Sequence, residues 1–250
     1  MKTDYRHLAR TALARAKTEL DANDDARLRY AALELRNVLE ALTYDRAQAF
    51  KDELPPEQYK AWQPRKLMKA LIEFDPSLDS PVTIAVGIQD DPATPAPPER
   101  MTVLGTDNPI TSQNVRDHYD ALSSYLHVPT PQSKERDGAK LRARCGEIVI
   151  FSETILSSRV WNSTLGNVVT LPECVKCKKP INKKVPLGSK PISAQCLECN
   201  AEYEITENDQ GDVIFIPQMR PVRCGNKDCK HRTLLWLDEL KPGKEWQCEQ

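Results

Sequence analysis

The chain has 250 residues, and its 35 Lys and Arg residues nearly balance its 36 Asp and Glu residues. This length suits one large domain or two domains of ordinary size, at roughly 100–200 residues per domain. No apolar run approaches the ~20 residues that cross a bilayer, and the start of the chain lacks the continuous apolar segment of a secretion signal. We therefore expect a cytoplasmic protein with no membrane partner.

The first part of the chain has the periodicity of helices. Apolar residues recur at three-four spacing over residues 5–20 and again over 28–42, which predicts two amphipathic helices, the second continuing towards residue 50. A short helix is expected over 57–62. Another helix is expected after Pro64, ending before Asp75 because a residue that precedes proline disfavours the helical conformation.

Two short β-like runs follow, at 82–88 and 101–105, separated by an acidic loop rich in proline. We expect them to pair as a hairpin insert at about 79–108. Helices are then expected from Thr111 or Ser112 to 126 and from 134 to 160, with Cys145 as a small buried apolar side chain. Beyond residue 167, short β segments alternate with proline, glycine and cysteine pairs.

The expected fold class is therefore α+β. An N-terminal helical bundle with a β-hairpin insert spans residues 1–165, and a β-rich zinc-ribbon region spans 166–250. Within this region a first ribbon is expected at 170–206 and a second at 218–250.

The C-terminal region holds seven of the eight cysteines, which in a reducing compartment hold metal more often than they form disulfides. Cys174 and Cys177 are separated by two residues, as are Cys196 and Cys199. Two such turns complete a tetrahedron of thiolates around one zinc ion. Because four protein ligands leave no position for water, this zinc site is expected to be structural.

A second set of metal ligands lies closer to the end of the chain. Cys224, Cys229 and Cys248 supply three thiolates, and His231 is the only nearby fourth donor in the sequence. We predict a second closed zinc site from this set. An alternative reading leaves His231 as a solvated side chain between two cations.

Positive charge is concentrated between the first two cysteine pairs. Residues 174–197 contain no acid and six lysines, which are Lys176, Lys178, Lys179, Lys183, Lys184 and Lys190. Such a surface binds the phosphates of nucleic acid without sequence preference, and the affinity falls with salt. These lysines are the predicted nucleic-acid contacts, although a lysine run can also be an ordinary solvated surface.

Two segments of the helical part carry a family resemblance. The run RYAALELRNVLEALTYDR from Arg29 to Arg46 resembles the second helix of HEPN-like domains, and YDALSSYLH from Tyr119 to His127 is similar to another part of such proteins. These domains are helical bundles of prokaryotic toxins, RNA-processing enzymes and antiviral systems. The resemblance covers about residues 1–160 without the insert, and it implies a bundle that forms a homodimer.

Catalytic members of that group are metal-independent endoribonucleases. Their motif is an Arg followed by a His after four to six intervening residues, and the residue directly after the Arg is typically polar. Arg36-Asn37 matches the first half of this motif, but no Arg and His in the chain have the required spacing. If the domain is catalytic, the residues that would converge are Arg36, Arg116, His118 and His127, together with Glu34 and Tyr119. Histidine would serve as acid or base, and arginine would stabilise the charged phosphate.

The sequence contains no phosphate-binding glycine motif, no HExxH and no GxSxG. We therefore expect a nucleic-acid-associated zinc protein of prokaryotic defence or RNA metabolism. Two alternatives remain open. One is a ribonuclease with a diverged active site, and the other is a protein-interaction subunit of a larger complex.

Overall fold

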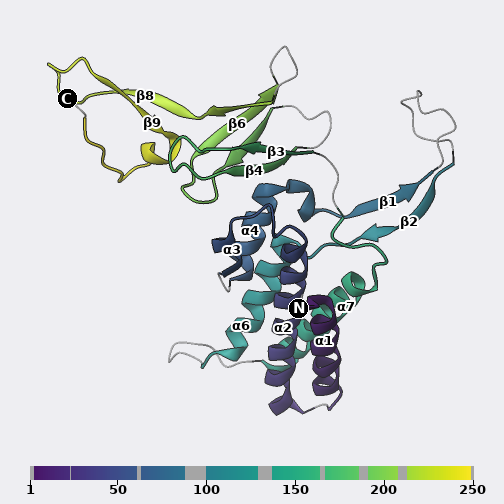
Figure 1. The fold of residues 1–250 in the computed structure, drawn as a ribbon. Helices are drawn as coiled ribbons and strands as arrows, with labels where there is room; N and C mark the ends of the chain where they lie inside the picture. The colour runs from purple at the N-terminus through teal and green to yellow at the C-terminus, as the bar shows by residue number, and fades with distance from the viewer. Residues whose placement is uncertain are drawn as a thin grey trace. The chain divides into compact units, whose positions relative to one another are not determined.

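The computed structural model describes residues 3–22, 24–60, 63–87, 100–128, 137–163, 167–185, 191–207 and 213–248. The protein is mixed α+β, as expected, with small antiparallel sheets in its C-terminal part (Figure 1). The chain divides into two compact units. The helical unit comprises residues 1–72 and 76–164, and the β-rich unit comprises 73–75 and 165–250.

The helical unit is centred on α2 (Leu28–Ala49), which packs against α1 (Tyr5–Asp21), α6 (Asp120–Leu126) and α7 (Gly138–Ser157). Asp4 begins α1 by accepting a hydrogen bond from the His7 amide. Small alanines and leucines of α1 and α2 form the shared core, including Ala9, Ala16, Ala31, Ala32, Leu35 and Leu39. The three-four periodicity of the sequence therefore marks the buried faces of both helices.

Shorter elements complete the unit. They are η1 (Asp25–Arg27), α3 (Pro56–Lys60), α4 (Pro64–Phe74), η2 (Pro76–Asp79), α5 (Ser112–Asn114) and a π-helical turn, η3 (Val115–Tyr119). Helix α4 ends immediately before Asp75, as predicted. Helix α7 is shorter than the predicted 134–160, because Asp137 caps its start by accepting from the Lys140 amide and Ser158 leaves the helical conformation. Residues 134–136 of that prediction lie outside the described residues.

The predicted pairing of the two β-like runs is confirmed. Strands β1 (Val82–Val86) and β2 (Thr102–Asp107) pair antiparallel, with a bulge between Ile84 and Ala85. The proline-rich loop between them lies mostly outside the described residues.

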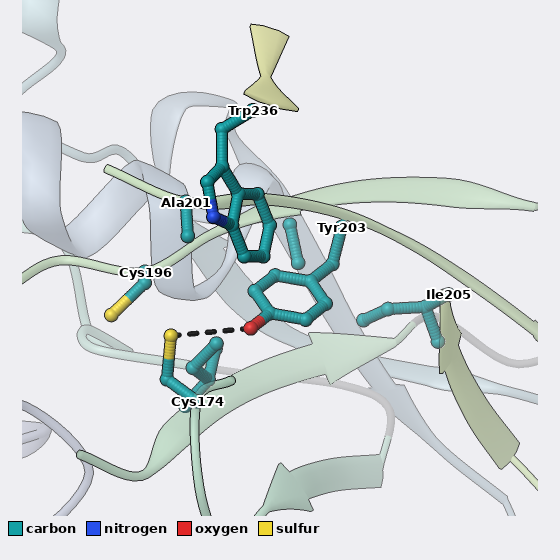
Figure 2. Packing of buried hydrophobic residues seen from close by; sticks show 8 residues of the cluster. Cys174, Cys196, Ala201, Tyr203, Ile205 and Trp236 are labelled. Carbon is teal, nitrogen blue, oxygen red and sulfur yellow. Dashed lines mark hydrogen bonds between the residues drawn. The ribbon is translucent and has the colours of Figure 1, made fainter. Parts of the chain in front are cut away.

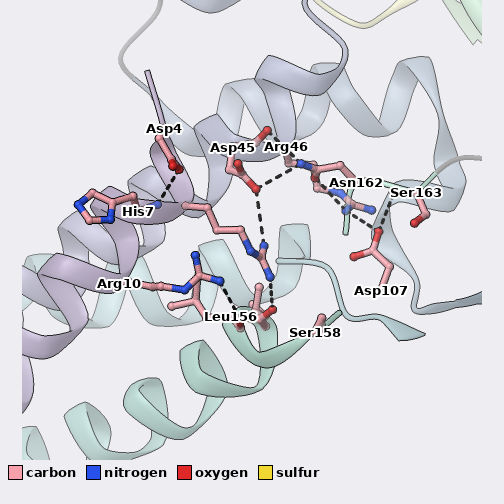
Figure 3. Close-up of polar contacts among 12 residues, drawn as sticks. Asp4, His7, Arg10, Asp45, Arg46, Asp107, Leu156, Ser158, Asn162 and Ser163 are labelled. Atoms are coloured by element: carbon pink, nitrogen blue, oxygen red, sulfur yellow. Dashed lines mark hydrogen bonds and ion pairs between the residues drawn. The ribbon is translucent and has the colours of Figure 1, made fainter. Parts of the chain in front are cut away.

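A buried polar network joins four segments of the helical unit (Figure 3). Arg6 donates to the Ile155 carbonyl at 2.7 Å and faces the Asp45 carboxylate at 3.7 Å. Arg46 pairs with Asp107 at 3.2 Å, with both side chains almost fully buried. Losing one partner of such a buried pair leaves an uncompensated charge, so a substitution on either side of the Arg46–Asp107 pair should destabilise the helical unit.

The described residues of the β-rich unit form three antiparallel sheets. One pairs β3 (Asn167–Leu171) with β4 (Ile181–Val185), a second orders β5 (Ile192–Gln195), β6 (Glu202–Glu207) and β7 (Val213–Pro217), and a third pairs β8 (Met219–Arg223) with β9 (Arg232–Trp236). A short 3-10 helix, η4 (Leu237–Leu240), follows β9. Figure 2 shows the core of this unit, where Tyr203 and Trp236 pack beside Cys174 and Cys196.

Across the described part of the chain, no helix is both long enough and apolar enough to cross a membrane.

Candidate metal centre

Two matching turns hold the first four cysteines. The turn between β3 and β4 carries Cys174 and Cys177, and the turn between β5 and β6 carries Cys196 and Cys199. In the first, the Cys174 amide donates to the Lys179 carbonyl at 2.8 Å and its carbonyl accepts from Lys178 at 2.9 Å. The second repeats this pattern, since Cys196 bonds with Ala201 and Asn200 at 2.9 Å each.

Both turns also use the left-handed backbone conformation at the same place. Lys178 has a φ of 64° and Asn200 a φ of 60°, each four residues after the first cysteine of its pair. Asparagine tolerates this conformation comparatively well, whereas lysine rarely adopts it. Lys178 therefore adopts an unfavourable backbone conformation in a turn that points the sulfurs of Cys174 and Cys177 towards the same place.

The four sulfur atoms have the spacing of a tetrahedral metal site. Cys174 Sγ lies 3.7 Å from Cys199 Sγ, and Cys177 Sγ lies 3.6 Å from Cys196 Sγ. All four sulfurs lie within 4.8 Å of one another. A tetrahedron of Zn–S bonds of about 2.3 Å separates its sulfurs by about 3.8 Å. The residues therefore fit a zinc ion, and the distances are far longer than the roughly 2.05 Å of a disulfide.

Tyr203 on β6 orients one of these sulfurs (Figure 2). Its hydroxyl accepts a hydrogen bond from the Val175 amide at 2.9 Å and lies 3.1 Å from Cys174 Sγ. Because the amide can only donate, the hydroxyl proton is left to bond the sulfur. Such contacts to a ligand atom fix its position and favour the thiolate.

The cysteines of this group respond differently to their surroundings. Burial opposes ionisation of Cys174, but hydrogen bonds from Tyr203 and from nearby amides outweigh it and lower the pKa of this thiol to about 7. Burial raises the pKa of Cys196 and of Cys199. A metal cation at the centre would offset the mutual repulsion of four adjacent thiolates and favour their ionised form.

A metal held by all four thiolates would have no open position for water or substrate. Cys174 and Cys196 are fully buried, and the apolar core of the unit surrounds them. The arrangement can therefore serve to fold the unit, and it offers no site for a reaction at the metal.

The second cysteine group comprises Cys224, Cys229 and Cys248, whose sulfurs lie within 4.8 Å of one another. Cys224 Sγ accepts from the Asn226 amide at 3.5 Å, and this bond is the main reason that the pKa of Cys224 is lowered. The predicted fourth ligand, His231, is not part of this group. Its carbonyl instead accepts from the Cys224 amide at 3.1 Å, continuing the ladder between β8 and β9.

The predicted lysine surface is largely compensated by acids distant in sequence. Lys183 bonds the carbonyl and carboxylate of Glu73, and Lys184 lies 3.6 Å from the Asp75 carboxylate, with both lysine side chains buried in this unit. Lys176 pairs with Glu239 at 2.8 Å and with Asp238 at 3.4 Å.

Only Lys178 and Lys179 of the predicted six are described as exposed. Lys190 lies outside the described residues. The expectation of a six-lysine surface is therefore corrected, because the sequence count covered only the acids within 174–197 and missed those that approach from elsewhere.

Among the predicted catalytic residues, Arg36 and Tyr119 come together with Glu40. The guanidinium of Arg36 donates to Tyr119 Oη at 2.5 Å and to Glu40 Oε1 at 3.2 Å, and Tyr119 Oη donates to the same carboxylate oxygen at 2.9 Å. Arg36 also lies over the Tyr119 ring, 4.5 Å from its centroid. Glu40 is the member of this cluster that the sequence did not single out for chemistry.

The other candidates have separate surroundings. Arg116 bonds Gln113 and Asp117 on its own helical turn. His118 packs against the Phe151 ring, and burial, aided by Arg144, lowers its pKa. His127 is exposed and caps α6 through its amide. Glu34 lies 3.9 Å from Arg15 in a cleft of about 300 Å³ between α1 and α2 that Glu40 also lines.

Comparisons of this chain with models of protein families, with curated proteins and with solved structures find no match.

Proposed function

We propose that this chain is a nucleic-acid-associated zinc protein, in which a structural zinc ion holds the β-rich unit and that unit contacts nucleic acid. The closed four-cysteine group carries the proposal. Because its sulfurs match the spacing of tetrahedral zinc and leave no open ligand position, its contribution is to fold a small module. Such a module acts through the surface that it presents.

The charge of that surface favours a polyanion. Lys178 and Lys179 are exposed beside the first cysteine group, and the segment 219–232 contains five cations and one acid. Cations of this kind bind phosphates by releasing counterions. Acidic proteins would be attracted by the same charge, so the binding experiment needs an acidic polypeptide as a competitor.

The experiment measures fluorescence anisotropy of a labelled duplex DNA and a labelled single-stranded RNA with the full chain. We expect binding that weakens steeply between 50 and 200 mM salt, on the order of 10³-fold for six phosphate contacts. Polyglutamate of matched charge serves as the acidic competitor. Absence of binding to either nucleic acid at low salt would refute the proposal and favour a protein-interaction subunit.

For the helical unit we propose a HEPN-like domain that dimerises and acts in RNA metabolism or prokaryotic defence. The contact between Arg36 and Tyr119 supports it, because the two segments on which the resemblance rests pack together. Sedimentation of the full chain tests dimerisation. A monomer at tens of micromolar protein would count against the domain assignment.

A ribonuclease is the second candidate, and the Arg36–Glu40–Tyr119 cluster is what favours it. The cluster joins a cation, a carboxylate and a phenol at a π-helical turn, a feature frequent at functional sites. Incubation with transfer RNA and single-stranded RNA at enzyme excess tests it, with Arg36→Ala and Tyr119→Phe compared to the exposed-site control Arg29→Ala. Intact RNA with the unmodified chain would rule the activity out.

A further inference from the structure

The hairpin β8–β9 and its turn carry a concentration of uncompensated charge. Residues 219–232 contain five cations, which are Arg220, Arg223, Lys227, Lys230 and Arg232, and all five are exposed. Asp228 is the only acid in this segment. Among the described residues, none of the five cations has an ion-pair partner, in contrast to Lys176, Lys183 and Lys184 of the same unit.

The strand register places two of these cations against each other. Arg223 of β8 is the cross-strand partner of Arg232 on β9. Directly opposed residues of an antiparallel pair share one face, and like charges there destabilise the hairpin. An arginine pair in this position opposes folding, and an anion that binds between the two guanidinium groups would relieve the repulsion.

The same face continues into an exposed apolar pair. Pro221 is paired with Leu234, which is 59% exposed, and the next pair on the same face is Met219 and Trp236. Trp236 is buried in the core of the unit. One end of the hairpin is therefore fixed to the core by Trp236, while the cations at the other end are exposed.

The cysteine group at the other end of the hairpin supplies the second anchor. An isolated two-stranded ribbon is marginally stable in water. Cys224 directly follows β8 and Cys229 lies in the turn, while Cys248 comes from the segment after η4. A metal on these three thiolates would tie the turn to the returning chain and hold the flanking cations in place.

We propose that the β8–β9 hairpin, with its Arg223–Arg232 pair, is the surface that grips the phosphodiester backbone of nucleic acid. This inference rests on the proposed function and specifies where the contact is made. A two-stranded β-ribbon matches the width of the major groove of duplex DNA, whereas the deep, narrow groove of duplex RNA does not admit it. Duplex DNA is therefore expected to bind more tightly than duplex RNA of equal length.

The test compares two double variants of the full chain with matched loss of charge. Arg223→Gln with Arg232→Gln neutralises the hairpin, and Lys178→Gln with Lys179→Gln neutralises the exposed lysines beside the first cysteine group. Anisotropy titrations use a 24-base-pair duplex DNA, the corresponding duplex RNA and vesicles containing phosphatidylserine, across a series of salt concentrations.

We expect the hairpin variant to bind duplex DNA at least about tenfold more weakly, with the salt slope reduced by about 2 for two lost phosphate contacts. The lysine variant should retain most of the affinity. If the lysine variant loses binding and the hairpin variant keeps it, this inference is overturned while the proposed function stands. If the unmodified chain binds no nucleic acid, or prefers the vesicles, both fail.

A stability readout separates a binding surface from a structural one. Because Arg223 and Arg232 repel each other, Arg232→Gln should leave unchanged or raise the denaturation midpoint of the β-rich unit while weakening DNA binding. Arg232→Glu should raise it further by forming an opposite-charge pair. A lower midpoint in both variants would show that the arginines support the fold, which would overturn the inference.

Discussion

The two cysteine groups of the β-rich unit differ in completeness and in burial. The first has four thiols from two matching turns, two of them fully buried, and a tyrosine that bonds one sulfur. The second has three half-buried thiols, two of them from one turn and one from the returning chain. We infer that the first group is part of the core, while the second stabilises an exposed hairpin.

The largest expected effect follows from breaking the first group. Cys196→Ser should abolish zinc binding there and unfold the β-rich unit, since structural zinc contributes about 10–16 kcal/mol to folding in small zinc modules. The helical unit has its own buried core and should keep its helical circular dichroism. Limited proteolysis would reveal cleavage confined to residues beyond 165. A β-rich unit that stays protected would contradict this role.

Breaking the second group should have a smaller and more local effect. Cys229→Ser is expected to lose one zinc equivalent and to loosen the β8–β9 hairpin, while the core around Tyr203 and Trp236 stays folded. Near-ultraviolet circular dichroism sums over the ordered aromatic rings of the whole chain, and the contribution of these two rings is the part to follow. Their signal should persist in Cys229→Ser and disappear in Cys196→Ser, and equal loss in both would show that the two groups fold as one.

The bond from Tyr203 to the Cys174 sulfur predicts an intermediate effect. Tyr203→Phe keeps the ring in the core but removes the hydroxyl, which leaves the Val175 amide without its partner. Zinc affinity should fall about 10–100-fold, as for other residues that orient a metal ligand. Competition with a chelator measures this change. Tyr5→Phe, in the helical unit, is the control and should leave the zinc affinity unaltered.

The smallest effect is expected at Cys145, which belongs to neither cysteine group. It is fully buried in α7, and burial raises its pKa to about 11. Because the pKa is raised, its thiolate is scarce at every pH below about 11, so alkylation at pH 8 should be slow. After zinc is removed, mass spectrometry should find the seven other cysteines modified and Cys145 unmodified. Rapid labelling of Cys145 in the folded chain would contradict its placement.

Features encoded locally were predictable from the sequence. The apolar stripe of α1 and that of α2 each arise from spacing within a single helix. The proline after Asp75 ends α4 where expected. The first cysteine group follows from two paired spacings, since two-residue gaps aim both thiolates at one point. For these features, a short stretch of sequence contains the relevant physical chemistry.

Features that depend on partners distant in sequence were missed. Lys183 pairs with Glu73, 110 positions away, and Lys176 pairs with Asp238, 62 positions away. A count of charges in the local sequence therefore overestimated the number of unpaired lysines. The buried pair of Arg46 and Asp107 also joins residues far apart. The sequence shows five cations and one acid in residues 219–232. That Arg223 and Arg232 lie opposite each other is known only from the strand register.

A closed zinc site at Cys174, Cys177, Cys196 and Cys199 is the feature on which the proposed folding of the β-rich unit depends most. Zinc X-ray absorption on the Cys229→Ser variant isolates this site from the second group. We predict one zinc ion per chain, with four sulfur neighbours at about 2.3 Å. Less than one zinc per chain, or a nitrogen or oxygen neighbour in place of a sulfur, would contradict a closed four-cysteine site.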